Sequence, residues 1–210
     1  MHSEALTPAT QRVLTALGES GLTKEVYLAG GSALALCFGH RFSVDLDWFG
    51  EDVRITDTFR QQLLDIGKLV IHSTSTDTFH GTLGGVEISF FRYPYALIAP
   101  KKRYAKNIYL ASERDIACMK LDAVATRGSR KDFVDLYFLL QHYDFAELFG
   151  FMREKYSGLE YNTTHLLKSL VFFDDAQKSP MPNMIAKVEW HEMKSEIEKK
   201  VKAFVAASAQ

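Results

Sequence analysis

Residues 26–50 read VYLAGGSALALCFGHRFSVDLDWFG, and the rest of the chain is organised around this stretch. In order, it predicts a short apolar strand over 26–29, a turn at Gly30, Gly31 and Ser32, a helix over 32–38 that ends at Gly39, and a second strand over 44–49. A glycine-rich turn that opens a helix presents backbone N–H groups and the positive end of the helix dipole to an anion. The stretch therefore predicts a phosphate site.

Two carboxylates on the second strand predict a metal site next to this turn. Asp45 and Asp47 are two residues apart, so they lie on the same face of the strand. Acidic residues are poor strand formers, and two of them on one face repel each other unless a cation lies between them. Mg²⁺ is commonly held by one or two carboxylates together with phosphate oxygens and water. The alternative is that both are ordinary solvent-facing residues of a half-exposed strand.

Length and composition are those of a soluble globular protein. The chain has 210 residues, of which 47% are apolar and 24% charged, and its formal net charge is −1. No global positive field therefore indicates nucleic-acid binding, although Lys101, Lys102, Arg103 and Lys106 form one basic cluster and Arg127, Arg130 and Lys131 another. The two cysteines, Cys37 and Cys118, are expected to be buried thiols. Without a signal peptide or an apolar run long enough to span a membrane, we expect a cytoplasmic protein.

The order of predicted elements indicates an α/β half followed by a helical half. Helices are expected over 7–18 and 56–66, strands over 69–75, 78–83, 86–93 and 108–110, and helices over 112–128, 129–143, 144–156, 163–173 and 188–206. We therefore predict an α+β fold of the α/β type, with a mixed sheet and flanking helices, in a domain over 1–110. A C-terminal helical bundle over 111–210 follows it, and we expect this second domain to complete a cleft.

Outside the central stretch, Glu87 and Lys120 are the main candidates for chemistry. Glu87 is the one acid in an otherwise apolar and hydroxyl-bearing strand, so it is either a third metal ligand or an exposed residue that discourages aggregation at a strand edge. Lys120 lies in an apolar helix and needs an anionic partner, which is either a carboxylate such as Asp132 or Asp135 or a nucleotide triphosphate. Arg127 lies on the same helix face as Lys120, and the sequence favours neither a structural nor a phosphate-binding role for it.

Asp132 has a simple structural alternative. Together with Ser129 it resembles a capping box at the start of the next helix, and an acid at this position also compensates the helix dipole. The seven histidines show no ligand spacing that would predict a zinc site. The sequence contains neither GxxxxGK[ST] nor GxGxxG, which argues against P-loop and dinucleotide-binding folds.

Two segments resemble a known enzyme family. Gly30-Gly31-Ser32 followed by Asp45-Leu46-Asp47 resembles the signature of the polymerase-β-like nucleotidyltransferase superfamily. The fuller string GGSALALCFGHRFSVDLDWF is similar to the AbiEii/AbiGii-type toxin branch, with Trp48 in place of the usual Phe. The later segment DIACMKLDAVATRGSRKDFVDLYFLL resembles the branch's Lys-containing helix and its (Arg/Lys)-Asp-x-x-Asp motif.

The resemblance implies roles that the spacing alone does not give. Gly30, Gly31 and Ser32 would hold a nucleoside triphosphate, and Asp45 and Asp47 would bind Mg²⁺ or Mn²⁺, with Glu87 as the third catalytic acid and metal ligand. Lys120 would contact the triphosphate and Asp132 would support the site. The expected reaction is metal-assisted attack of an acceptor hydroxyl on the α-phosphate with release of pyrophosphate. Members of the branch act as toxins, some by adding nucleotides to tRNA ends, which implies a cognate antitoxin as a partner.

Three functions are consistent with these residues. The first is a magnesium-dependent nucleotidyltransferase that modifies tRNA, another RNA or a protein, as the toxin of a toxin–antitoxin or abortive-infection system. The second is a non-catalytic module that binds a nucleotide or a partner in the same cleft, which the near-neutral net charge favours. The third is nucleotide transfer to a small molecule such as an antibiotic, which differs from transfer to RNA because RNA binding weakens as salt rises.

Overall fold

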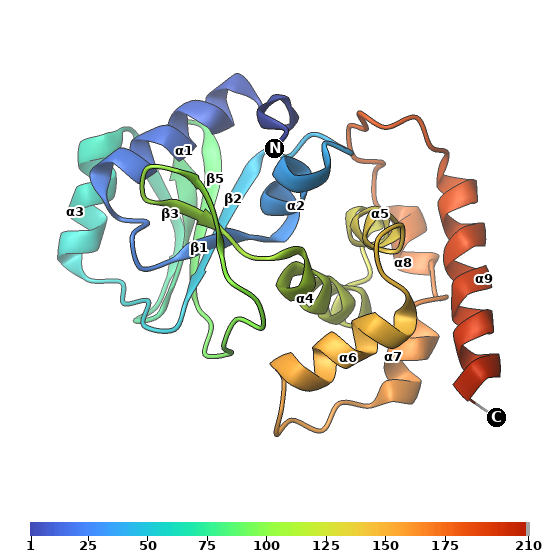
Figure 1. Cartoon of the computed structure of the whole chain (residues 1–210). Helices are drawn as coiled ribbons and strands as arrows, with labels where there is room; N and C mark the ends of the chain where they lie inside the picture. Colours follow the sequence, from blue (N-terminus) through green and yellow to red (C-terminus); the bar gives the residue numbers. More distant parts are fainter. Residues whose placement is uncertain (209–210) are drawn as a thin grey trace. The chain divides into compact units, whose positions relative to one another are not determined.

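The chain folds into two compact units, Met1–Ser112 and Glu113–Gln210. The structure is a computed structural model that describes residues 1–208. Figure 1 shows the first unit in blue to green and the second in olive to red.

The first unit is built on one mixed seven-stranded sheet. The strand order is β3-β4-β5-β2-β1-β7-β6, in which β2 pairs parallel with β5 and β1 pairs parallel with β7, and all other neighbours are antiparallel. The strands are β1 Tyr27–Ala29, β2 Asp45–Gly50, β3 Leu69–Thr74, β4 Thr78–Leu83, β5 Val86–Arg92, β6 Lys102–Ala105 and β7 Ile108–Leu110. The helices are η1 Ser3–Ala5, α1 Pro8–Ser20, α2 Gly30–Phe38 and α3 Asp57–Ile66. The expected fold class, a mixed sheet with flanking helices, is confirmed.

Strand β2 lies in the middle of this sheet and separates the core from the polar face. Its even positions, Leu46 and Trp48, are fully buried, whereas Asp45 and Asp47 are half-buried on the other face. The Trp48 ring stacks on Phe90 of β5 with ring centroids 6.0 Å apart. Phe59 of α3 packs edge-on against the same Phe90, so α3 covers the apolar face of the sheet (Figure 1). The apolar core therefore determines which face carries the two acids.

The second unit is entirely helical within residues 113–208. Its helices are α4 Glu113–Thr126, α5 Arg130–Leu139, α6 Phe145–Lys155, α7 Thr163–Ser169, α8 Asp174–Lys178 and α9 Trp190–Ser208. Helix α4 contacts α5, α6 and α7, and α9 packs along α5 and α6 (red in Figure 1). The buried stripe of α9 consists of Met193, Ile197 and Val201.

Four local predictions are wrong in detail. The glycines do not form a turn ahead of the helix, because α2 already begins at Gly30. The region 163–173, predicted as one helix, instead contains α7 and then a turn before the short helix α8. Strand β6 was not predicted, because half of its four residues, KRYA, are charged. The Ser129 hydroxyl does not cap α5 but donates to the Asp132 carboxylate at 2.6 Å, so the predicted capping box does not form.

Helices α1 and α3 begin at side-chain caps and α2 ends at a glycine, as their sequences predict. Thr7 accepts from the Thr10 N–H at 3.2 Å at the start of α1, and Thr56 does the same for Phe59 at 3.1 Å at the start of α3. Gly39 ends α2 with a φ of 65°, a left-handed conformation that suits glycine. Among residues 1–208, no helix is long and apolar enough to cross a membrane.

Candidate active site

The first part of the candidate site is the N-terminus of α2. Gly30 has a φ of 64°, so the chain turns from β1 into the helix through a left-handed residue. The N-cap residue is Ala29, whose methyl side chain cannot accept a hydrogen bond from the first turn. The first N–H groups of a nine-residue helix therefore face the end of β1 without a side-chain cap. This is the arrangement in which a helix N-terminus binds phosphate.

Ser32 connects this first turn to the start of β2. Its hydroxyl is buried and hydrogen-bonds to the Ser43 hydroxyl at 2.9 Å and to the Asp45 backbone carbonyl. Ser43 in turn donates to Asp45 Oδ1 at 3.1 Å. The two serines thus hold the turn and the first acidic residue of β2 together. We predicted Ser32 as a nucleotide ligand, and its hydroxyl lies inside this network.

The two aspartates lie on the same face as predicted, and the turn is next to them. Asp47 pairs with Ala29 across β1, so it is opposite the residue that precedes the turn. A side chain on Gly30 would place its Cβ 3.3 Å from Asp47 Oδ2, which is tighter than an ordinary van der Waals contact. The N-terminus of α2 and the acidic pair are therefore next to each other.

The backbone of Glu87 lies beside Asp45 in the sheet, but its carboxylate interacts with side chains other than the two aspartates. Its Cα is the partner of Asp45 in the parallel β2–β5 pairing. Its carboxylate accepts from Thr82 Oγ1 at 2.5 Å and lies 3.5 Å from the Nε2 atoms of both His72 and His80. The hydrogen bond from Thr82 lowers the pKa of Glu87, and both histidines add to this effect. Together they outweigh partial burial, which by itself would raise that pKa. Glu87 is thus oriented by side chains of β3 and β4.

Asp45 and Asp47, on one face of β2, would be the protein ligands of a divalent cation at this site. Within residues 1–208, no three His, Cys, Asp or Glu side chains are arranged so that they could hold a metal by themselves. Mg²⁺ does not need such a set, because it keeps several waters and takes its remaining ligands from substrate phosphates. Asp47 lies beside Gly30 at the N-terminus of α2, which is where such phosphates would bind. Two carboxylates at this position would suit Mg²⁺ or Mn²⁺ held together with a nucleotide.

The second group of predicted residues lies in the helical unit, where Lys120 and Asp132 meet. Lys120 Nζ is 3.2 Å from Asp132 Oδ1 and 2.7 Å from Asp135 Oδ2, and all three side chains are at least 95% buried. This cluster joins α4 to α5. Of the two kinds of partner expected for Lys120, the structure thus provides the carboxylates.

Arg127 completes this cluster from the surface. Its Nε and Nη2 donate to the two oxygens of Asp132, both at 2.8 Å, while 57% of its side chain stays exposed. Burial by itself would raise the pKa of Asp132. The Arg127 hydrogen bonds, the Lys120 charge and the Ser129 hydroxyl outweigh it and lower the pKa to about 2. Asp132 is therefore a buried, ionised carboxylate.

The predicted residues are thus brought together in two groups, one in each unit. Gly30, Gly31, Ser32, Asp45 and Asp47 form the first. Lys120 and Asp132 form the second. Sequence reasoning gave no role to Arg41 or Ser43, although both are buried beside the first group. Their positions directly before the acidic strand were the available signal.

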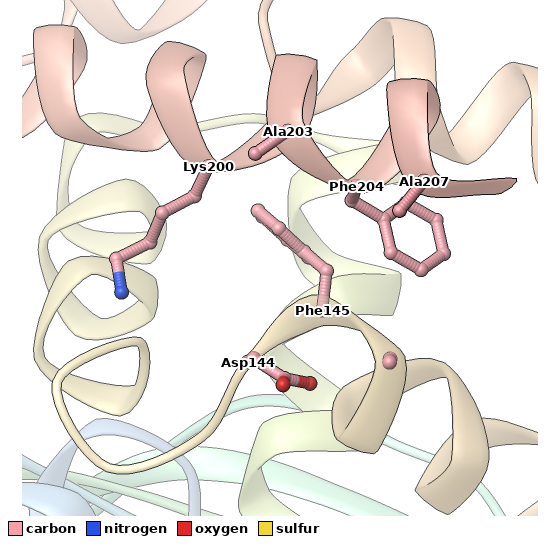
Figure 2. A pocket seen from close by; sticks show the side chains of 7 residues that line it. Asp144, Phe145, Lys200, Ala203, Phe204 and Ala207 are labelled. Atoms are coloured by element: carbon pink, nitrogen blue, oxygen red, sulfur yellow. The ribbon is translucent and has the colours of Figure 1, made fainter.

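A separate cavity in the helical unit contains none of the predicted residues. It has a volume of about 260 Å³ and lies between the N-terminus of α6 and the last turns of α9. Figure 2 shows Phe145 and Phe204 along it, with Asp144 and Lys200 at its rim. Both rim residues have structural roles, since Asp144 caps α6 and Lys200 donates to the Leu140 carbonyl at 2.9 Å. The cavity is therefore a gap between two helices, and the polar side chains at its rim already hydrogen-bond to the protein backbone.

Comparison with known proteins gives consistent results. Residues 12–209 match the family described as nucleotidyl transferase AbiEii toxin, type IV TA system. An uncharacterized protein of Aquifex aeolicus is 36% identical over 190 residues, which is 88% of this chain and 90% of that protein.

Solved structures share the fold at low sequence identity. A provisionally named nucleotidyltransferase from H. pylori aligns with a TM-score of 0.57 at 17% identity, covering 93% of both chains. The nucleotidyltransferase toxin MenT4 of Mycobacterium tuberculosis aligns with a TM-score of 0.54 at 13% identity, covering 92% of this chain and 83% of MenT4.

Proposed function

Because the chain belongs to the AbiEii nucleotidyltransferase toxin family, we propose that it transfers a nucleoside monophosphate from an NTP to an acceptor hydroxyl. The observation that carries the proposal is that Gly30, at the N-terminus of α2, lies beside the Asp47 carboxylate, with Asp45 on the same face of β2. A helix N-terminus next to two carboxylates supports the binding of a metal–triphosphate complex, which needs an anion site beside a cation site.

In this proposal the N–H groups at Gly30 and Gly31 bind phosphate oxygens, and Ser32 fixes the turn to β2. Asp45 and Asp47 hold Mg²⁺ or Mn²⁺, which when bound neutralises phosphate charge and lowers the pKa of the acceptor hydroxyl. The bond between the acceptor oxygen and the α-phosphorus forms as the bond to the bridging oxygen of pyrophosphate breaks, and the hydroxyl proton passes to solvent water. The family resemblance adds Lys120 and Asp132 on the nucleotide side.

Glu87 is included as the candidate third ligand because its backbone position is opposite Asp45. Its present partners give a clear test. If Glu87 ligates the metal, Glu87→Gln will reduce transfer as strongly as Asp45→Asn. If instead Glu87 only organises His72 and His80, Glu87→Gln will leave metal affinity unchanged.

The acceptor we propose is tRNA or another RNA, with a protein as the next candidate, and a cognate antitoxin as the partner. The MenT4 likeness in fold and the family description support a toxin that acts by nucleotide transfer. Each of the four α-labelled NTPs, incubated with total tRNA, total RNA or total protein and with Mg²⁺ or Mn²⁺, will identify the base and the acceptor.

The decisive variants are Asp45→Asn and Asp47→Asn. Each is expected to lower transfer about 100-fold or more, because the site loses half of its protein ligands. Asp57→Asn is the matched control, since Asp57 lies on α3 in the same unit and its side chain is 99% exposed. Wild-type protein that is folded but transfers no nucleotide under any of these conditions would refute the proposal.

One observation favours a second candidate, a module that binds a nucleotide without transferring it. The Glu87 carboxylate is occupied by Thr82, His72 and His80, so two acids rather than three face the turn. This alternative predicts that an NTP with Mg²⁺ raises the melting temperature without turnover. It also predicts that Asp45→Asn abolishes this stabilisation.

A further inference from the structure

Arg41 is a buried cation beside the candidate site. Only 4% of the residue is exposed, although arginine is rarely buried in proteins. It lies in the connection between α2 and β2, where its Nη1 donates to the Phe42 carbonyl at 3.1 Å.

The guanidinium fills the space where residue 31 would carry a side chain. A Cβ built on Gly31 would collide with Arg41 Nη2 and lie 3.3 Å from Arg41 Cζ. Gly31 is not one of the residues with a positive φ, so the backbone there does not itself require glycine. The two glycines are thus constrained differently: the φ of 64° favours glycine at position 30, whereas a side chain at position 31 would displace the Arg41 guanidinium.

The serines that connect the start of α2 to the acidic strand border the same space. The Cβ position built on Gly31, which overlaps Arg41 Nη2, is 3.5 Å from Ser43 Oγ. Ser43 donates to Asp45 Oδ1 at 3.1 Å and is hydrogen-bonded to Ser32 at 2.9 Å. Arg41 therefore lies against Gly31, beside the side chains that connect the first turn of α2 to β2.

We infer that Arg41 is a positioning residue of this site, whose buried guanidinium braces the Gly30–Gly31 turn against the start of β2. The inference rests on the proposed function, because it assigns Arg41 to the geometry of the same nucleotide site. Arg41 keeps the N–H groups of the turn and the Asp45–Asp47 pair in one fixed arrangement. Glycine at position 31 is the consequence of this arrangement.

A double-mutant cycle between positions 31 and 41 tests this contact. Gly31→Ala is expected to lower the melting temperature by about 5 °C or more, because its methyl group meets Nη2. In an Arg41→Lys background, which has no Nη2 atom, the same change should cost less than half as much. Equal costs in both backgrounds would overturn the inference, and Arg41→Ala provides a second background for the same comparison.

Binding of an NTP with Mg²⁺, measured by calorimetry below the melting temperature of every variant, tests the positioning role. Gly31→Ala and Arg41→Lys are each expected to weaken nucleotide binding about tenfold, and the double variant also about tenfold rather than a hundredfold. Additive losses, or no loss in Arg41→Lys, would refute the role.

Gly18→Ala is the matched control. Gly18 is a buried glycine of α1 whose Cβ would lie 2.6 Å from the Lys106 carbonyl oxygen, so this variant should also melt earlier. It should keep the wild-type nucleotide affinity and show no coupling to Arg41→Lys. If wild-type protein binds no nucleotide, the proposed function fails, while the melting cycle still decides whether Arg41 braces the turn.

Discussion

Replacing Lys120 by methionine tests whether the cluster between α4 and α5 stabilises the helical unit. Lys120→Met keeps most of the side-chain volume but removes the cation that lies 2.7 Å from Asp135 and 3.2 Å from Asp132. Both carboxylates are fully buried, so water cannot replace the positive charge of Lys120 that offsets their negative charges. We expect the free energy of unfolding to fall by about 3–5 kcal/mol. Arg127→Met should cost about 1 kcal/mol, because that side chain is largely exposed.

The two tryptophans make this effect measurable in one unit at a time. Trp48 lies in the sheet and Trp190 in α9, so a Trp48→Phe background leaves Trp190 as the reporter of the helical unit. Urea unfolding followed by Trp190 fluorescence at pH 7 gives the free energy. Adding Asp135→Leu to Lys120→Met should recover more than half of the loss, since apolar replacement of a buried ion pair is often neutral. A loss below about 1 kcal/mol, or no recovery in the double variant, would refute this reasoning.

Three further predictions concern buried ionisable groups of the same unit. The pKa of Asp132 in the folded state, about 2, lies below its ordinary value of 3.8, so the ionised carboxylate contributes about 2 kcal/mol to the free energy of unfolding. This contribution is complete above pH 4 and is lost as the pH falls towards 2. Asp132→Asn should remove this part of the acid destabilisation, measured by urea unfolding at each pH. Burial raises the pKa of Cys118 to about 12, so in a Cys37→Ser variant a thiol reagent at pH 8 should react only after unfolding, and rapid reaction of the native protein would contradict the predicted burial. Lys155→Met should lower the free energy of unfolding by about 3–5 kcal/mol, because Lys155 and Asp115 form a fully buried ion pair at 2.7 Å. The double variant Asp115→Leu with Lys155→Met should have a free energy of unfolding within about 1.5 kcal/mol of the wild-type value.

Most of the sheet could be predicted from its sequence because local signals agreed with the fold. The alternation of Leu46 and Trp48 with Asp45 and Asp47 predicted both the strand and its polar face. Strand β6 lacked such a signal, because it is short and half of its residues are charged. It is a strand because it pairs with β7. The short helix α8 is similarly a product of packing, since α5 lies against it.

The candidate site could be predicted only as far as its residues are close in sequence. The turn and the acidic pair come from one stretch, so their proximity followed from strand and helix geometry. The partners of Glu87 come from β3 and β4 and depend on strand order, which periodicity does not determine. Arg41 is a case of a different kind, because a cation next to a serine and an acid reads as a surface residue until its burial is known.

The alternation along β2 has a consequence for how mutations divide between stability and activity. Positions 46 and 48 belong to the core, whereas 45 and 47 belong to the candidate site, so the two kinds of constraint are interleaved residue by residue. A mutational scan of this strand should give two out-of-phase profiles, with abundance sensitive at even positions and toxicity at odd ones. A one-residue insertion before Asp45 would exchange the two sets and cost both properties at once. Inactive but well-folded descendants of such a protein are therefore expected to arise by substitution at odd positions of β2.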